Sequence, residues 1–272
     1  MLDYMQQLAV LAMMLTARWP SVSKNSMPFP RKWWLSLIYP FMAVAGCYLL
    51  LLCANYYYAS RAAYLLQRIR TLPLDNSSVA ELRHWGAEHG FRYEEARDCA
   101  DQPCIHMVSP NNRWMWLLFK SPSLVKIGER LGLRPWITAG DLEIDKGQVV
   151  GKIYAVGFYR GRDYPEIEAL ASDERKLGVT ACAYYPLKRH PGYAFGNASN
   201  VRSFRVLVSD PASAENRQNA FQFNLKCLTG WHKCSQFSEL MPAAWNDYEE
   251  DGKWAETHPD TFVWQVGTDC PY

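Results

Sequence analysis

Hydrophobic positions run without a charged residue over residues 33–58, WWLSLIYPFMAVAGCYLLLLCANYYY. At about 1.5 Å per helical residue, this run exceeds a membrane hydrocarbon core of about 30 Å. Arg31 and Lys32 precede the run, and Trp or Tyr residues stand at both of its ends, where they favour the membrane interfaces. The pattern predicts one transmembrane helix, which Pro40 should kink without preventing the span.

Apolar positions keep a helical spacing beyond this run, so the helix is expected to continue as an amphipathic stalk. These positions are Ala62, Leu65, Leu66 and Ile69. The stalk should end at Leu72, because Pro73 follows it. A second helix is predicted after the capping box of Ser78 and Glu81, with its end near Gly90.

The apolar period then changes to that of short strands separated by turn residues. Strands are predicted over residues 91–99, 105–109, 113–120, 141–145, 149–159, 179–185, 203–209 and 220–227. The last of these also fits a helix through Phe221, Leu225 and Leu228. The strands over 141–145 and 149–159 are expected to form a hairpin through the turn Asp145-Lys146-Gly147. Short helices are expected near residues 124–131 and 238–248, and residues 188–201 are expected to form a long exposed loop.

The expected fold class is α+β, with an N-terminal transmembrane helix followed by an extracytoplasmic domain that has two leading helices and an antiparallel sheet. The predicted organisation is a cytoplasmic segment over residues 1–32, the transmembrane helix over residues 33–58 and one domain over residues 59–272. No internal repeat or low-complexity linker divides the domain further.

Composition excludes a disordered chain, because 49% of the residues are hydrophobic and 21% are charged. The first 32 residues carry four basic side chains and one acidic, whereas the rest carries 25 basic and 26 acidic. A near-neutral body lacks the clustered Lys and Arg that nucleic acid binding needs, so we expect no nucleic acid partner. The lipid bilayer is the expected partner instead.

Charge alone does not orient the helix, because Arg61, Arg68 and Arg70 follow it almost as densely as basic residues precede it. Six of the eight cysteines lie after residue 60, and an even number in one domain favours an oxidising compartment. We therefore expect the N-terminus in the cytoplasm and the domain outside the cell membrane.

Two pairs of cysteines flank short connections. In CADQPC, Cys99 ends one predicted strand and Cys104 begins the next, and CLTGWHKC repeats the arrangement with Cys227 and Cys234. The preferred disulfides are Cys99 with Cys104, Cys227 with Cys234, and Cys182 with Cys270, although six cysteines allow many connectivities. Closing each short loop should stabilise the fold by about 2 kcal/mol.

A zinc site is the alternative use of this region. Its ligands would come from Cys99, Cys104, His106, Cys227, His232 and Cys234. The spacings match no finger or ribbon, and thiolate sites suit reducing compartments, so disulfides are preferred and no metal is expected. A redox Cys-x-x-Cys motif is absent from the sequence.

Asp141, Glu143 and Asp145 alternate with Leu142 and Ile144, so a strand would place the three carboxylates on one face. A cation such as calcium could bind there. The simpler interpretation is the solvent-facing side of a half-buried strand.

Trp114 and Trp116 would share one strand face and could form an aromatic platform for sugars or peptides. Other aromatic residues that could extend it are Tyr184, Tyr185, Tyr193 and Phe195. The alternative is that these rings fill the core, which is the commoner role of aromatic side chains.

No catalytic residue is predicted. The sequence has no nucleophile elbow, phosphate-binding loop, dinucleotide-binding motif or zinc-protease motif. Glu166 and Glu168 could form a carboxylate pair, but no partner histidine accompanies them. We therefore expect no cofactor.

Two processing alternatives stay open. Val44-Ala45-Gly46-Cys47 is similar to a lipoprotein cleavage box, which would make Cys47 the lipidated N-terminus, but apolar residues follow it at once. Met27 could be the true start of the chain. An uncleaved signal anchor is the preferred interpretation.

Four segments together carry a resemblance to a known family: YLLQRIRTLPL, SSVAELRHWGAEHGF, CADQPC and FNLKCLTGWHKCSQFSELMPAAW. With the preceding span they resemble a bacterial family of uncharacterised single-pass membrane-anchored envelope proteins, over most of residues 33–248. The resemblance implies no activity. The order of helix, helix and sheet is also loosely similar to small outer-membrane assembly lipoproteins, but their glycine-led motif is replaced by Leu74-Asp75-Asn76.

The leading hypothesis is a non-catalytic binding or assembly module of the bacterial cell envelope, whose partner is another envelope protein or cell-wall glycan. The alternative is a membrane-anchored hydrolase or metal-dependent enzyme that uses carboxylates near Asp141 or Glu166. A eukaryotic secretory protein is a third option, because Asn76-Ser77-Ser78 and Asn197-Ala198-Ser199 are glycosylation sequons.

Overall fold

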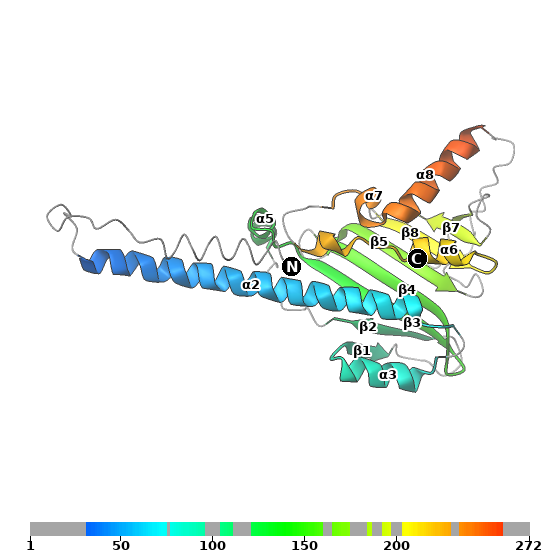
Figure 1. The fold of residues 1–272 in the computed structure, drawn as a ribbon, viewed down its shortest axis with the longest axis horizontal. Helices are drawn as coiled ribbons and strands as arrows, with labels where there is room; N and C mark the ends of the chain where they lie inside the picture. The colour runs from blue at the N-terminus through cyan, green and yellow to red at the C-terminus, as the bar shows by residue number, and fades with distance from the viewer. Residues whose placement is uncertain are drawn as a thin grey trace. The chain divides into compact units, whose positions relative to one another are not determined.

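The computed structural model describes residues 31–74, 77–95, 104–110, 121–159, 165–174, 184–186, 192–196, 203–229 and 234–257 (Figure 1). The chain divides into two units, Met1–Leu50 and Leu51–Tyr272. The division falls inside helix α2 (Arg31–Thr71), which therefore contributes residues to both.

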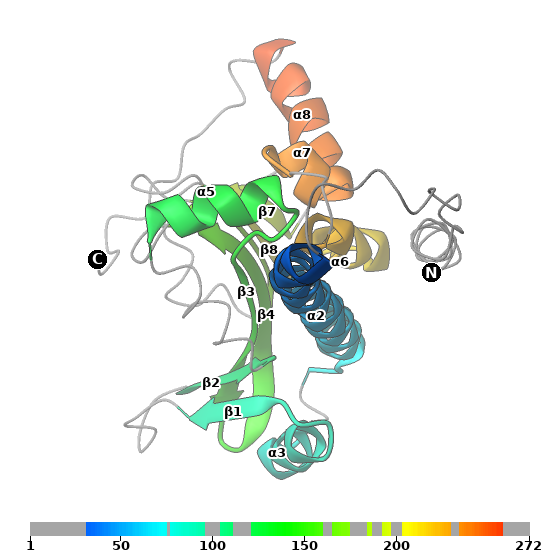
Figure 2. The same ribbon diagram turned by 90° about the vertical axis from the view of Figure 1, so that its left-hand side faces the viewer.

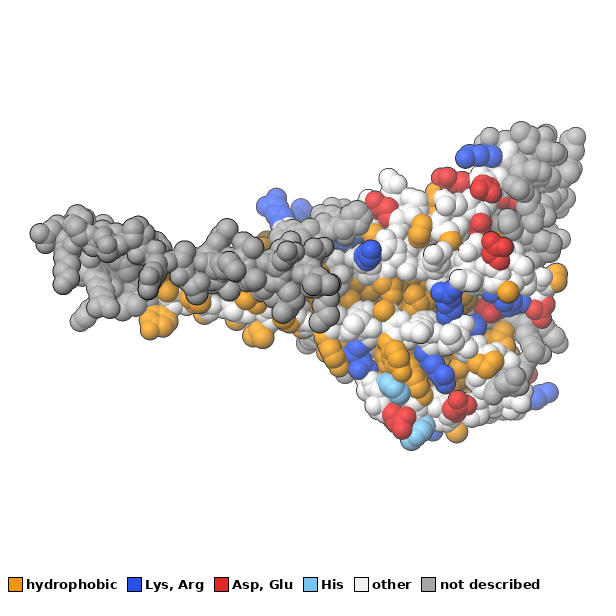
Figure 3. Space-filling view, viewed as in Figure 1, with side chains coloured by type: hydrophobic (Ala, Val, Ile, Leu, Met, Phe, Trp, Pro, Cys, Tyr) orange, Lys and Arg blue, Asp and Glu red, His pale blue; other side chains and the backbone are white. Residues whose placement is uncertain are grey.

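Helix α2 is 41 residues long and contains Pro40, as the sequence predicts. Its residues in the first unit expose large apolar side chains, and Figure 3 shows orange side chains along this part of the helix. The exposed residues there are Ile38, Tyr39, Phe41, Met42, Val44, Leu49 and Leu50. Within the described part of the chain, α2 is the one helix long and apolar enough to cross a membrane, judged by length and composition.

Helix α3 (Val79–Glu88) confirms the second predicted helix. The hydroxyl of Ser78 accepts a hydrogen bond from the backbone N–H of Glu81 at 3.3 Å, which satisfies one of the free donors of the first turn. Gly90 follows the helix with a φ of +63°, a conformation that glycine adopts without a steric penalty.

Strands β3 (Trp136–Asp145) and β4 (Gln148–Tyr159) form the predicted hairpin, although β3 begins five residues earlier than the sequence indicates. Lys146 and Gly147 make the turn with φ values of +49° and +80°. Two positive φ angles in a two-residue loop match the right-handed twist of the strands they connect.

Eight strands form one sheet in the order β1-β2-β3-β4-β5-β8-β7-β6. Six of the neighbouring pairs are antiparallel, whereas β5 and β8 are parallel, so the sheet is mostly and not wholly antiparallel. The other strands are β1 (Arg92–Glu95), β2 (Cys104–Ser109), β5 (Pro165–Glu174), β6 (Tyr184–Pro186), β7 (Tyr193–Gly196) and β8 (Ser203–Ser209). The other helical elements are α5 (Pro122–Arg130), α6 (Ala214–Ala220), η1 (Leu225–Leu228), α7 (Phe237–Leu240) and α8 (Pro242–Thr257).

One face of the sheet carries the core. Along β3, buried and half-buried residues alternate, and the buried set is Trp136, Thr138, Gly140, Leu142 and Ile144. Figure 2 shows the second half of α2 and helix α6 on the same side of the sheet. The apolar side chains of α2, η1, α7 and α8 belong to one buried cluster with this face.

The strand predicted over residues 220–227 is wrong, and the helical alternative holds only for Leu225–Leu228, which form the 3-10 helix η1. Residues 220–227 form no strand, because the backbone N–H of Asn224 donates to the carbonyl of Leu240 at 2.8 Å and its side-chain amide donates to the carbonyl of Glu239 at 3.0 Å. The segment thereby bonds to helix α7, contacts the sheet through the rings of Phe223 and Tyr154, and ends in η1.

The expected exposed loop over residues 188–201 contains strand β7, whose residues Tyr193, Ala194 and Phe195 are buried. The glycine and proline residues around this short strand are typical of loops, so a prediction based on composition does not detect the strand. The predicted strand over residues 113–120 lies outside the described residues.

Candidate functional site

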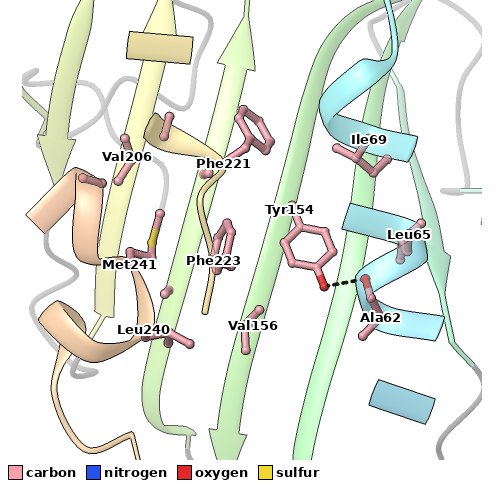
Figure 4. Packing of buried hydrophobic residues seen from close by; sticks show 14 of the residues in the cluster. Ala62, Leu65, Ile69, Tyr154, Val156, Val206, Phe221, Phe223, Leu240 and Met241 are labelled. Carbon is pink, nitrogen blue, oxygen red and sulfur yellow. Dashed lines mark hydrogen bonds between the residues drawn. The ribbon is translucent and has the colours of Figure 1, made fainter. Parts of the chain in front are cut away.

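The second half of α2 is a core element and not a free stalk. Its inward residues are nearly inaccessible, with Ala62 and Leu65 at 0% exposure and Ile69 at 2%. Figure 4 shows these three residues beside Tyr154 on β4. Their spacing of three and four residues places them on one face of the helix, which therefore packs on the sheet.

A glycine on the sheet allows this close approach. A Cβ atom added to Gly140 would lie 2.9 Å from both Cγ1 and Cδ1 of Ile69, and 3.5 Å from Cδ1 of Leu65. Real Cβ atoms essentially never approach other heavy atoms so closely, so a larger residue at this position would require the Ile69 side chain or the helix to shift.

Buried polar groups tie the same helix to the sheet at Asn55. Trp136 Nε1 donates to Asn55 Oδ1 at 2.9 Å, and Asn55 Nδ2 donates to the carbonyl of Leu228 at 3.0 Å. Asn55 is 1% exposed. The amide thus connects three separate segments: the helix, strand β3 and η1. The indole N–H of Trp136 and the carbonyl of Leu228 both gain a hydrogen-bond partner in this way.

A second tie lies about two turns further along the helix. The hydroxyl of Tyr154 donates to the backbone carbonyl of Ala62 at 3.0 Å, as Figure 4 shows. Burial raises the pKa of this hydroxyl well above its ordinary value, so it stays protonated and remains a donor.

The end of α2 is capped by a lysine from the sheet. Lys152 Nζ donates to the carbonyl of Leu72 at 2.8 Å and to that of Arg70 at 3.2 Å. The last carbonyls of a helix lack partners within the helix, and a positive charge there also opposes the negative end of the helix dipole. Lys152 therefore fixes the point at which α2 ends on the sheet.

The charge of Lys152 is balanced by Asp173 on β5, whose Oδ2 lies 3.5 Å from Nζ. Arg217 on α6 also pairs with Asp173, and its second nitrogen lies 2.5 Å from Oδ1 of Asp210. Burial lowers the pKa of Lys152 and raises that of Asp173, while the opposite charges counteract both shifts. The cluster joins helices α2 and α6 to two central strands.

Aromatic rings connect α2 to α3. The ring of Tyr64 stacks with those of Trp85 and Phe91 at centroid distances of 5.8 Å and 6.3 Å, and Trp85 and Phe91 stack at 5.0 Å. The guanidinium of Arg61 lies 4.3 Å from the centroid of Phe91. Stacking and cation–π contacts each contribute about 1 kcal/mol, so α3 is held to the helix by side chains and not only by its loop.

The three predicted carboxylates do share one face of β3, since Asp141, Glu143 and Asp145 are all half-buried. Burial raises the pKa of Asp141 to about 6, and burial together with Asp145 raises that of Glu143. Oδ1 of Asp141 has no hydrogen-bond partner among the described residues. Over the same residues, no group of three or more His, Cys, Asp and Glu side chains is placed to hold a metal ion.

One predicted disulfide is present, between Cys227 and Cys234, which are 4% and 0% exposed. Bonded to each other, these two cysteines are not the thiolates that the zinc alternative requires. His106, another ligand of that alternative, instead hydrogen-bonds through Nδ1 to the hydroxyl of Tyr93. Cys99, Cys182, His232 and Cys270 lie outside the described residues.

The aromatic platform receives no structural support from the residues that are described. Tyr193 and Phe195 are buried at 1% and 2% exposure and contact each other edge to face, so they fill the core. Trp114 and Trp116 lie outside the described residues, as do the side chains of Tyr184, Tyr185 and Glu166.

Sequence reasoning missed Asn55, Gly140, Lys152, Asp173 and Arg217. A signal for Lys152 was available, because β4 places this residue on the same face as Tyr154 and Val156, where apolar residues are expected. A charge at a buried position of a strand indicates a buried partner. Nothing in the sequence shows that the partner is the end of α2.

Comparisons of the chain with protein-family models, curated proteins and solved structures find no match.

Proposed function

We propose that this chain is a single-pass membrane protein of the bacterial envelope, in which α2 anchors an extracytoplasmic, non-catalytic binding or assembly domain. The observation that carries the proposal is the change along α2 from exposed apolar residues to buried ones. Leu50 is 71% exposed, whereas Asn55 is 1% exposed and Ala62 and Leu65 are fully buried. One helix thus serves as anchor and as core element.

The buried Asn55 also refines the membrane boundary. A residue that bonds to Trp136 and Leu228 is part of the domain, so the span should occupy residues 33–54. At about 1.5 Å per residue this segment is roughly 33 Å long, which still crosses a hydrocarbon core of about 30 Å. Tyr56 and Tyr57, which are 41% and 56% exposed, then stand at the interface.

The disulfide between Cys227 and Cys234 supports an extracytoplasmic domain, because reducing compartments keep such thiols reduced. The positive segment before the span supports a cytoplasmic N-terminus. The resemblance to single-pass bacterial envelope proteins supports the same topology.

A binding or assembly role is supported by what the buried polar groups do. Asn55, Lys152, Asp173 and Arg217 are engaged in contacts that hold the helix and the sheet together. These contacts hold the domain rigidly on its membrane anchor. A rigidly held domain suits a protein that binds another envelope protein or cell-wall glycan with its surface.

Topology is tested with two fusions to the C-terminus of the full chain, alkaline phosphatase and green fluorescent protein. Alkaline phosphatase is active only in an oxidising compartment, so the phosphatase fusion is expected to be active. The green fluorescent protein fusion is expected to show no fluorescence. A fluorescent second fusion with an inactive first one places the domain in the cytoplasm and overturns the proposal. Peptide mapping without reductant on the same membranes should recover Cys227 linked to Cys234.

Binding is tested by photo-crosslinking in intact cells and by sedimentation of the detergent-solubilised chain with purified cell-wall glycan. Enrichment of one envelope protein, or co-sedimentation that soluble glycan fragments compete away, is expected. The absence of both contradicts a binding role.

A hydrolase or metal-dependent enzyme is the second candidate. The observation that favours it is the raised pKa of the Asp141 carboxyl. A carboxyl with a pKa of about 6 lies in the range that suits a general base. Cells that depend on the protein should lose its function with Asp141→Asn if this candidate is correct. Normal function of that variant at wild-type abundance rejects Asp141 as a catalytic base.

A further inference from the structure

Helix α5 exposes a strip of apolar side chains. Leu124, Ile127 and Leu131 are 48%, 54% and 41% exposed. Val125, on another side of the helix, is 1% exposed and packs into the domain. The spacing of the exposed residues by three and four places them side by side along α5, so the strip is continuous and faces away from the core.

Basic side chains border this strip. Lys126 and Arg130 are exposed, are four residues apart and therefore lie on one face of α5, next to Ile127. A short helix with an apolar strip beside a basic flank is the pattern of a helix that lies in the plane of a membrane surface. Anionic lipid headgroups complement the basic flank.

The position of α5 in the domain matches this pattern. The helix runs into β3, and the guanidinium of Arg134 between them lies 4.3 Å from the ring centroid of Phe158. Phe158 pairs with Trp136, which donates to Asn55. Figure 1 shows α5 beside the start of β3, at the end of the sheet opposite the β3–β4 turn. The strip therefore lies at the end of the domain that holds Trp136 and its partner Asn55.

We propose that α5 rests in the headgroup layer of the same membrane that α2 crosses, with Leu124 and Ile127 among the lipid chains and Lys126 and Arg130 on lipid phosphates. The inference depends on the proposed membrane anchoring. A lipid surface is the occupant favoured over a protein, because the strip lies at the end of the domain that holds Asn55, the first buried residue of α2 after the proposed span. The second contact would orient the sheet relative to the membrane plane.

The test uses the full chain in vesicles of equal parts phosphatidylcholine and phosphatidylglycerol. Cys47 and Cys53, the free thiols among the described residues, are first replaced by serine, and this parent is checked for dye uptake. An environment-sensitive dye is then attached to Ile127→Cys, to Val44→Cys at the middle of the proposed span and to Lys146→Cys in the β3–β4 turn. Quenching is measured with aqueous iodide and with lipids spin-labelled at a shallow or deep position.

The dye at Ile127→Cys is expected to lose fluorescence with the shallow lipid quencher and to resist iodide, while the dye at Lys146→Cys does the reverse. Quenching at Ile127→Cys by iodide alone overturns the inference, since the strip would then face water. Protection from both quenchers also overturns it, because a protein would cover the strip. The dye at Val44→Cys, at the middle of the proposed span, separates the two proposals. Deep-lipid quenching there with no lipid quenching at Ile127→Cys rejects only the role of α5, whereas the absence of deep-lipid quenching at Val44→Cys rejects the anchor itself.

Discussion

The indole nitrogen of Trp136 donates a hydrogen bond of 2.9 Å to the side-chain oxygen of Asn55, and both residues are buried. They are 81 positions apart in the chain. This bond marks the point at which an apolar, exposed helix becomes part of a folded domain.

Replacing Asn55 with leucine should destabilise the domain by about 3 kcal/mol. The Trp136 donor and the Leu228 acceptor would stay buried without partners, and each unsatisfied group costs about 1–3 kcal/mol. Denaturant unfolding of the full chain in detergent micelles, followed by tryptophan fluorescence, measures the loss. Gln67→Leu makes the same kind of change on the exposed face of α2 and should alter stability little. Equal effects of the two variants would refute the anchoring role of Asn55.

Gly140→Ala should lower the free energy of unfolding by about 1–3 kcal/mol, because the added methyl group would overlap the side chain of Ile69. Gly86→Ala is the matched control, since a Cβ at that helical position meets no atom within 4 Å. Alanine is also the better helix former, so this control should be neutral or slightly stabilising. Thermal unfolding of both variants decides the question, and a neutral Gly140→Ala would show that helix and strand are not in tight contact.

Lys152→Met should cost about 3 kcal/mol or more. The substitution removes the donor to the carbonyls of Arg70 and Leu72, and it removes one of the two cations beside Asp173. Lys226→Met, at an exposed position of η1, provides the control for loss of a lysine charge. Hydrogen exchange of the amides near Thr71 should speed up in the first variant alone. Unchanged exchange there would show that Lys152 does not cap the helix.

Asp141 should make stability fall as pH rises. Its pKa is raised from 3.8 to about 6, so the folded state holds the proton more tightly than the unfolded state does. The contribution is therefore fully present below about pH 4, is lost as pH rises toward 6 and stays lost above that value. Asp141→Asn, which cannot ionise, should match the wild type at low pH and exceed its stability by up to about 3 kcal/mol at pH 8. A constant difference between the two proteins across this range would exclude a raised pKa.

Local signals carried much of the helical prediction. The uncharged run and the spacing of Ala62, Leu65 and Ile69 predicted α2, and Pro73 predicted its end to within one residue, at Leu72 instead of Thr71. The pair Ser78 and Glu81 predicted the start of α3, because capping depends on residues three apart. Prediction of the β3–β4 hairpin succeeded for the same reason, since Lys146-Gly147 is a turn signal between apolar runs.

Long-range pairing was not predictable in the same way. Strand β5 carries Asp173 and Glu174 inside the protein, where they are 3% and 2% exposed. A prediction based on composition places such charged residues on the solvent-facing side. Their buried partners come from distant parts of the chain and cannot be identified from the local sequence. The same argument applies to the parallel pairing of β5 with β8, which no local turn encodes.

The sequence by itself determined that an apolar helix long enough for a membrane continues into an amphipathic one, because helical periodicity and charge are local properties. It also placed Cys227 and Cys234 around a short connection. Only the tertiary structure decided that the amphipathic part is a core element and not a stalk. That outcome depends on contacts that Gly140, Trp136 and Lys152 make with α2 across many intervening residues, and such contacts follow from packing and polar satisfaction in the whole domain.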